Sequence, residues 1–266
     1  MLVYVGAWLA LALVFDDLPR GVLRALLPSG SSPPGSFRIA TLNCAGGDPA
    51  AAREAADSGA ELVLLQESPG GESLAKLAKD RWGGDGACVP GPDCSILAKG
   101  KLETFGLGTL TSPRANFVWA VWQRRPGERY FVVSLRLQPP TFRLDYWNPD
   151  CWRAYAEDRA RRKSELADIV RSIEDLAIPQ DTPIIVGGDF NGTPTEGFQD
   201  SLGRICQDTF RQAGVGWGGT GTNDYPFVRF DQIWLQRSLS VARVETRRTA
   251  HSDHRMVLAM VGSRSK

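Results

Sequence analysis

Two hydrophobic patterns alternate along residues 37–262 of this 266-residue chain. Short runs rich in leucine and β-branched residues, bounded by glycine and proline, predict strands. Apolar residues spaced three and four positions apart predict helices. The predicted strands cover 37–43, 62–67, 95–98, 102–105, 117–123, 130–137, 183–187, 227–235, 241–246 and 256–261, and the predicted helices cover 49–58, 72–79, 153–176 and 195–202.

Residues that can bind a cation or move a proton lie at or near the ends of these strands. Asp189 and Asn191 follow the apolar run 184–186, and two residues apart they point to the same side of an extended chain. The glycines at 187–188 and Pro194 mark a loop that a ligand can approach closely. A turn that merely closes a strand is the alternative. The full set is Asn43, Glu67, Arg136, Asp189, Asn191, Asp231, Asp253 and His254, with Asp231 in the middle of its predicted strand.

Glu67 ends a run of leucines that should be buried. A charged residue in such surroundings is rarely fully buried unless it is paired or bound to a metal. The position therefore favours a metal ligand, although an ordinary glutamate at a strand end is the alternative for this residue taken alone.

The chain has two histidines, and both lie in the tetrapeptide 251–254, which also contains Asp253. Histidine is suited to general acid–base chemistry because its ordinary pKa lies near neutral pH. We expect His254 to act in this way, with the Asp231 carboxylate orienting its ring. A capped turn is the alternative.

A resemblance to a known family is carried by five short segments: Thr-Leu-Asn at 41–43, Leu-Leu-Gln-Glu at 64–67, Gly-Asp-Phe-Asn at 188–191, Phe-Asp-Gln-Ile-Trp at 230–234 and Ser-Asp-His at 252–254. Their order and their positions at strand ends resemble the endonuclease/exonuclease/phosphatase superfamily, which includes nucleases, sphingomyelinases and inositol phosphatases. The resemblance covers about residues 37–262. With its hydrophobic N-terminal stretch, the chain is most similar to membrane-tethered bacterial members.

The resemblance implies a four-layer α/β sandwich of two packed mixed β-sheets flanked by helices. It also implies a metal-dependent phosphoesterase in which water attacks a phosphodiester. Glu67, Asn43 and Asp253 would bind the metal, and an all-oxygen site suits Mg²⁺ or Mn²⁺. The other implied roles are that Asp189 orients or deprotonates the attacking water, that Asn191 holds the water or a phosphate oxygen, and that His254, oriented by Asp231, binds the phosphoryl oxygen or supports proton transfer.

Arg136 departs from the family pattern. Many members carry a histidine where this chain reads Ser-Leu-Arg-Leu at 134–137. A guanidinium stays charged at neutral pH and cannot donate a proton, but it can hold a phosphate through two hydrogen bonds. We therefore expect Arg136 to bind the substrate phosphate together with Asn191. What protonates the leaving group stays open.

Residues 2–15 carry no charge. As a helix they would reach roughly 21 Å, which is short of the ~30 Å hydrocarbon core of a membrane. We expect a membrane segment and an amphipathic turn over 1–28, a Ser/Pro/Gly linker over 29–36, and the catalytic domain over 37–266. A signal-peptide core, the end of a longer membrane region or a core helix are the alternatives. Arg20 and Arg24 hint at a cytoplasmic catalytic domain, but the side of the membrane stays open.

The composition and net charge argue against some kinds of site and partner but do not indicate a function. The chain is 42% hydrophobic and 23% charged, as is usual for a soluble globular domain. A formal net charge of +1 provides no overall basic field for nucleic acid. Five cysteines without a Cys-x-x-Cys pair argue against structural zinc. Cys88 and Cys94 could form a disulfide or stay free thiols, and the sequence does not decide between them.

An aromatic loop over 138–152 could stack on nucleic-acid bases, lie at a lipid interface or pack over the domain edge, and we favour packing. Three functions are compatible with the whole pattern. The first is an endonuclease- or exonuclease-type nuclease. The second is a phosphatase or phospholipase acting on a membrane lipid headgroup. The third is a catalytically inactive phosphate-binding module. We expect a monomer that acts on a phosphoester and associates with the membrane through its N-terminal segment.

Overall fold

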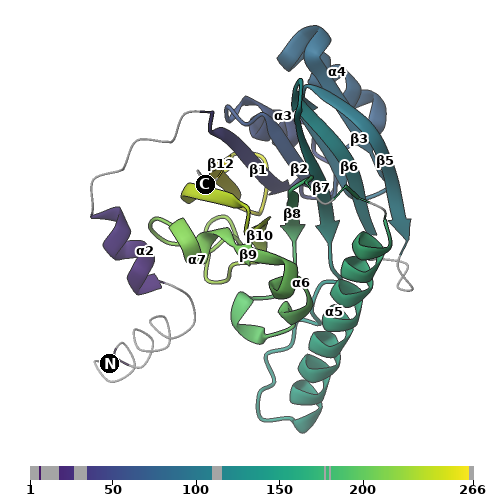
Figure 1. The fold of residues 1–266 in the computed structure, drawn as a ribbon. Coiled ribbons are helices and arrows are strands. Elements are labelled where there is room, and N and C mark those ends of the chain that lie inside the picture. The colour runs from purple at the N-terminus through teal and green to yellow at the C-terminus, as the bar shows by residue number, and fades with distance from the viewer. Residues whose placement is uncertain are drawn as a thin grey trace.

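Two six-stranded mixed sheets form the centre of the computed structural model, which describes residues 6, 18–26, 35–109, 116–176, 178–179 and 181–263. Apolar side chains from both sheets fill the space between them, including Ile39, Leu64, Val132 and Ile185. Helices cover the outer faces (Figure 1). The predicted four-layer α/β sandwich is confirmed.

The first sheet has the strand order β11-β12-β1-β2-β4-β3. β1 and β2 run parallel, and the other neighbours run antiparallel. Central strands that are covered on both faces need continuous apolar runs, which is what β1 and β2 supply. The strands are β1 (Phe37–Asn43), β2 (Leu62–Gln66), β3 (Gly86–Pro90), β4 (Ser95–Lys99), β11 (Leu239–Arg247) and β12 (Met256–Ser263).

The second sheet has the strand order β5-β6-β7-β8-β10-β9. β7 and β8 run parallel at its centre, and their neighbours run antiparallel to them. Both sheets therefore place a parallel pair in the middle. The strands are β5 (Lys101–Thr109), β6 (Asn116–Arg125), β7 (Glu128–Arg136), β8 (Ile184–Asp189), β9 (Cys206–Asp208) and β10 (Asp231–Gln236).

Four helices form the outer layers. The alanines of α3 (Pro49–Asp57) and the leucines of α4 (Gly71–Trp82) pack on the first sheet. The apolar face of α5 (Pro149–Asp175), the long helix at the lower right of Figure 1, packs on the second sheet together with α6 (Asp200–Ile205). A short helix, α7 (Thr209–Ala213), inserts Phe210 between the sheets.

Several predicted boundaries differ from the structure, and two of these differences have a clear local cause. Asn148 accepts a hydrogen bond from the Asp150 N–H and Pro149 occupies the first turn, so α5 begins before the predicted Arg153. The prediction that Asp231 lies in mid-strand is wrong, because the Thr220 hydroxyl accepts the N–H of Asp231 and the paired strand starts there.

The N-terminal part is described over residue 6 and over 18–26. Leu18–Ala25 form helix α2, and Arg24 donates hydrogen bonds to the carbonyls of Phe210, Arg211 and Gly214 beside it. Among the residues that the structure describes, no helix combines the length and the apolar character needed to cross a membrane. Residues 1–5 and 7–17 of the predicted membrane segment and 27–34 around the predicted linker lie outside the described residues, so both remain predictions.

All five cysteines are free thiols. Cys94 is buried in the core between the sheets, whereas Cys88 packs on the helix-covered face of the first sheet. The two side chains therefore leave the sheet on opposite faces, and the question left open by the sequence is answered in favour of two thiols.

Candidate active site

The predicted strand-end residues come together at one end of the sandwich, where the strand ends of the two sheets lie next to each other. In the second sheet, Arg136, Asp189 and Asp231 are register partners on the adjacent strands β7, β8 and β10. In the first sheet, Asn43 ends β1 and Glu67 directly follows β2. The Nδ2 of Asn43 donates to Oδ2 of Asp189 at 3.1 Å, which joins the two sheets through one hydrogen bond.

Asp189 is the buried centre of the site. Its Oδ1 accepts the Asn191 N–H at 2.9 Å, and its Oδ2 accepts the Asn191 Nδ2 at 3.2 Å. Asn191 has a φ of +49°, a left-handed conformation that asparagine tolerates better than most residues, and it also donates to the Leu137 carbonyl. Burial and the neighbouring Asp231 carboxylate raise the pKa of Asp189 to about 6. A carboxylate with a pKa near neutrality is suited to accept a proton from water.

Glu67 receives donors on both oxygens. Oε1 accepts Nδ2 of Asn43 at 3.0 Å and a guanidinium nitrogen of Arg136 at 2.6 Å, and Oε2 accepts the Gly46 N–H at 2.7 Å. Its φ of +44° turns the chain sharply after β2. Burial acts to raise the pKa of Glu67, but the hydrogen bond from Asn43 and the charge of Arg136 lower it overall, so the side chain is a carboxylate at neutral pH.

His254 and Asp231 form the second pair. Nδ1 of His254 lies 2.8 Å from Oδ2 of Asp231, which is fully buried. Burial acts to lower the pKa of His254, but the charge of Asp231 and its hydrogen bond raise that pKa to about 10. The imidazole is therefore held as a cation in the metal-free protein, with Nε2 as its second donor.

Ser252 fixes the position of this histidine. Its hydroxyl donates to the Asn43 carbonyl at 2.6 Å and accepts the His254 N–H at 2.9 Å. The tetrapeptide that contains both histidines is thus attached to the end of β1, so the imidazole and the Asn43 side chain share one support.

The residues present fit a divalent cation. Asp189, Asp231 and His254 each offer a ligand atom, and these atoms lie within 4.8 Å of one another. Oδ1 of Asp231 is buried and has no hydrogen-bond partner among the described residues. A buried carboxylate oxygen is normally paired, so this orphan is an acceptor available to a cation. Carboxylate and amide oxygens suit Mg²⁺ or Mn²⁺, and His254, which is held as a cation, lies beside them as a hydrogen-bond donor.

The three predicted metal ligands differ in how directly they border this cluster. Glu67 and Asn43 contact each other, and Asn43 also contacts Asp189. Asp253 is exposed, its backbone carbonyl accepts the Asn223 N–H, and its charge helps to raise the pKa of His254. Glu67 and Asn43 thus border the site directly, while Asp253 lies at its rim.

Asp93 is a site residue that the sequence reasoning missed. Its Oδ1 lies 3.4 Å from a guanidinium nitrogen of Arg136, and its Oδ2 is buried without a partner among the described residues. β2 and β4 pair antiparallel with Leu65 opposite Ser95, and continuing that register places Asp93 opposite Glu67. An acidic residue just before a buried strand, facing another acidic strand end, is the signal that could have identified it.

The aromatic loop is not packed as expected. Phe142 is 83% exposed and Trp147 is 85% exposed, whereas Tyr146, Trp152 and Tyr155 contact one another at the start of α5. The loop leaves β7 at Arg136, so its exposed rings lie on chain that starts at the site. The prediction of packing over the domain edge is therefore wrong for Phe142 and Trp147.

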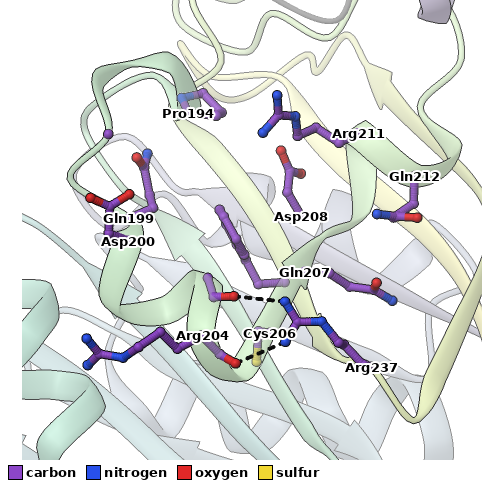
Figure 2. A pocket seen from close by; sticks show the side chains of 13 residues that line it. Pro194, Gln199, Asp200, Arg204, Cys206, Gln207, Asp208, Arg211, Gln212 and Arg237 are labelled. Carbon is purple, nitrogen blue, oxygen red and sulfur yellow. Dashed lines mark hydrogen bonds between the residues drawn. The ribbon is translucent and has the colours of Figure 1, made fainter.

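A cavity of about 440 Å³ opens elsewhere, between α6, α7 and the end of β10 (Figure 2). Its lining mixes polar and apolar groups, and Arg237, one of its lining residues, donates to the carbonyls of Gly203 and Arg204. None of the strand-end residues described above lines it. The cavity is thus separate from the carboxylate cluster.

Comparison with known families gives one match. Residues 40–254 match the family described as "Endonuclease/Exonuclease/phosphatase family". The matched range begins in β1 and ends at His254, so it includes all of the residues that meet at the site. No curated protein sequence matches the chain significantly.

Solved structures of low sequence identity share the fold. An endonuclease/exonuclease/phosphatase family protein from Bacteroides thetaiotaomicron is 14% identical with a TM-score of 0.67, covering 87% of this chain and 96% of its own. A mannosyl-6-phosphatase from the same organism is 16% identical with a TM-score of 0.63, covering 85% and 99%. D. rerio TDP2, complexed with a single-strand DNA product, is 16% identical with a TM-score of 0.63, covering 86% and 100%.

Proposed function

This chain belongs to the endonuclease/exonuclease/phosphatase family, and on that premise we propose that it is a Mg²⁺- or Mn²⁺-dependent phosphodiesterase of the nuclease type. One observation carries the proposal. The ligand atoms of Asp189, Asp231 and His254 lie within 4.8 Å of one another, and His254 is hydrogen-bonded to the buried Asp231. Phosphoester hydrolysis needs a positioned water, a proton acceptor and positive charge on the phosphoryl oxygens. The cluster and its neighbours supply each of these.

Asp189 is the proposed proton acceptor. Asn43 and Asn191 hold its carboxylate from two sides, and its pKa of about 6 allows it to be ionised at neutral pH and still basic. Asn191 stays neutral at every pH, so it can orient a water or a phosphate oxygen without competing for the proton.

His254 and Arg136 are the proposed contacts to the phosphoryl oxygens. The pKa of about 10 keeps His254 protonated at neutral pH, and its Nε2–H is free of the Asp231 contact made by Nδ1. The Arg136 guanidinium is 21% exposed and lies beside Asp189. Both groups can donate to an anion, but only His254 can also deliver a proton.

The metal would be held by Glu67 and Asn43, with Oδ1 of Asp231, unpaired among the described residues, as a further acceptor and Asp253 at the rim. Bound there, a divalent cation would neutralise charge that develops on the phosphoryl oxygens and lower the pKa of a bound water. The donors around Glu67 orient its carboxylate before any cation binds.

Nucleic acid is the proposed substrate class. The exposed rings of Phe142 and Trp147 follow Arg136 along the chain and offer flat faces on which bases can stack. The fold is also that of TDP2, which has been captured with a single-strand DNA product. Several arginines of α5, among them Arg153 and Arg161, are exposed and can contact phosphates.

A lipid headgroup is the second candidate, and a different observation favours it. Val22, Leu23 and Leu26 of the α2 segment are exposed and apolar, and they follow the predicted membrane segment. On this hypothesis the protein is membrane-associated and acts on phosphoesters at the bilayer surface as a phosphatase or phospholipase. That the protein associates with the membrane, on which side its domain lies and that it is a monomer are all part of this proposal.

The test is hydrolysis by the full chain of bis-p-nitrophenyl phosphate, plasmid DNA and phosphoinositide vesicles. We expect turnover with Mg²⁺ or Mn²⁺ that stops with a chelator and falls at least 10³-fold in Asp189→Asn. Folded Asp189→Asn with unchanged turnover would overturn the assignment, and no turnover on any substrate together with no metal binding would favour an inactive phosphate-binding module.

Salt dependence separates the two substrate classes. Binding that involves several phosphate contacts weakens steeply with salt because counterions are released from the nucleic acid. We expect the KM for DNA to rise at least tenfold between 50 and 200 mM salt. A lipid enzyme that binds through apolar side chains would instead keep its activity on vesicles over that range.

A further inference from the structure

Arg136 lies among three carboxylates. Its guanidinium is 2.6 Å from Oε1 of Glu67 and 3.4 Å from Oδ1 of Asp93, and its Nε is 3.9 Å from Oδ2 of Asp189. The side chain is 21% exposed, and its Nε is buried without a hydrogen bond among the described residues. It is therefore a permanent positive charge built into the acidic side of the site.

Sheet geometry produces this arrangement from both layers. Arg136 ends β7 in register with Asp189, whereas Asp93 precedes β4 opposite Glu67 in the other sheet. Among the described residues, the hydrogen bond of the Asp93 carboxylate is the one that its Oδ1 accepts from the guanidinium. Asp93 thus shares the guanidinium with Glu67 and offsets part of its charge.

The charges predict a competition for Glu67. A divalent cation bound by Glu67 would be close to the Arg136 guanidinium and repelled by it, since both share the Glu67 carboxylate. The Asp93 carboxylate has the opposite effect on the bound cation, because it offsets part of the positive charge of the guanidinium that it contacts. Two like charges a few ångströms apart in a half-buried site interact by several times the thermal energy.

We infer that Arg136 and Asp93 form a counter-charge pair that sets the affinity of the site for a divalent cation, with Arg136 weakening that affinity and Asp93 strengthening it. Asp93 acts through Arg136, which its Oδ1 contacts, and is a positioning residue. This inference rests on the proposed function, because it concerns the cation used by the same site.

The test is a calorimetric titration in which Mn²⁺ is added to the metal-free full chain and its affinity is measured. We expect Arg136→Gln to bind Mn²⁺ about tenfold more tightly and Asp93→Asn to bind it about tenfold more weakly than the wild type. The double variant should return to within about threefold of the wild type, because both charges are removed together. A purely structural ion pair would instead weaken binding in both single variants.

Two further variants separate charge from shape. Arg136→Lys keeps the charge and should bind Mn²⁺ within about threefold of the wild type. Arg129 and Glu103 form an ion pair at the other end of β7, roughly 23 Å along the strand from Arg136, and supply the matched control. Arg129→Gln and Glu103→Gln should leave the Mn²⁺ affinity unchanged.

The outcomes distinguish this inference from the proposed function. If the wild type binds Mn²⁺, Glu67→Gln abolishes binding and Arg136→Gln binds no more tightly, the counter-charge pair is refuted and the metal site stands. If the wild type binds no Mn²⁺, both are refuted. Should Arg136→Gln not fold in a thermal melt, the weaker binding expected of Asp93→Asn and the nearly unchanged binding expected of Arg136→Lys still decide, and a wild-type affinity in Asp93→Asn would overturn the inference.

Discussion

On one side of Asp189, Arg136 contacts Glu67 and Asp93; on the other side, His254 contacts Asp231. Each side pairs acidic groups with one cationic side chain. The Arg136 side is half-buried, with Arg136 at 21% and Glu67 at 26% exposure, whereas on the other side His254 is 15% exposed and Asp231 is fully buried. A guanidinium keeps its charge at any physiological pH, but an imidazolium can release a proton.

The difference assigns separate tasks to the two sides. A fixed charge near solvent suits binding and release of ions, because it costs little to exchange one partner for another there. A titratable pair in a buried setting suits proton transfer, because its protonation state is controlled by few neighbours. The four predictions below test this division, and each would change or refine it.

Loss of the imidazole should have the largest effect. We expect His254→Gln to lower kcat on plasmid DNA about 10³-fold, because its alkoxide leaving group needs a proton and the protonated donor is lost while Asp231 keeps a hydrogen-bond partner. Steady-state kinetics at saturating Mn²⁺ measure this, with His251→Gln, an exposed histidine in the same tetrapeptide, as the control. A decrease below tenfold would mean that the His254 side does not move the proton.

Loss of the guanidinium should have a smaller effect of a different kind. At saturating Mn²⁺ we expect Arg136→Gln to reduce kcat/KM about 10- to 100-fold, mostly through KM, because a charged hydrogen bond to the phosphate is lost. Arg136→Lys should recover part of the loss. If kcat falls as far as in His254→Gln, the two sides share one task and the comparison fails.

The pH dependence of the free energy of unfolding should depend on His254 and not on Arg136. His254 binds its proton more tightly in the folded chain, where its pKa is about 10, than at its ordinary value of 6.5. Its contribution to stability is therefore fully present below pH 6.5 and is lost as the pH rises toward 10. In chelator, we expect the difference in free energy of unfolding between wild type and His254→Gln to shrink by a few kcal/mol over that range.

Urea denaturation at three pH values across that range measures this difference. The corresponding difference for Arg136→Gln should stay constant, because arginine does not titrate there. A pH-independent difference for His254→Gln would show that Asp231 does not hold the imidazole as a cation.

The rim residue should have the smallest effect. Asp253 is exposed, and its charge is the weakest of the three acidic influences that raise the pKa of His254. We expect Asp253→Asn to lower the pKa of His254 slightly and kcat/KM by less than about tenfold, since an exposed charge is well screened. Titration of the His254 ring by NMR measures the first change. An unmoved pKa with abolished Mn²⁺ binding would instead establish Asp253 as a principal ligand.

The sequence identified residues whose function follows from their place on one strand. Asp189 and Asn191 could be found because an apolar run, two glycines and a loop point to a strand end. Gly188 supports that interpretation, because a side chain there would collide with the Leu135 carbonyl on the neighbouring strand. The pairing of His254 with Asp231 was also expected, because one of only two histidines needed an orienting carboxylate and Asp231 was available.

Features that depend on contacts between distant strands were missed. Asp93 meets Arg136 only through the pairing of β2 with β4 and the packing of the two sheets, neither of which a local pattern contains. The start of β10 at Asp231 depends on the Thr220 hydroxyl, which is eleven positions away in the chain. The exposure of Phe142 and Trp147 depends on what lies beside the loop, so apolar composition alone wrongly favoured packing.

The hydrogen bond from Asn43 to Asp189 has a consequence for how activity arises during synthesis. One partner lies in a sheet built from β1–β4 with β11 and β12, and the other lies in the sheet built from β5–β10. A nascent chain that has emerged through β10 can therefore have completed the second sheet while β1 still lacks its neighbour β12 and Ser252 has not yet attached His254 to Asn43. We expect ribosome-bound intermediates of that length to be catalytically silent, so the cell would meet this hydrolase only after its first and last strands have joined.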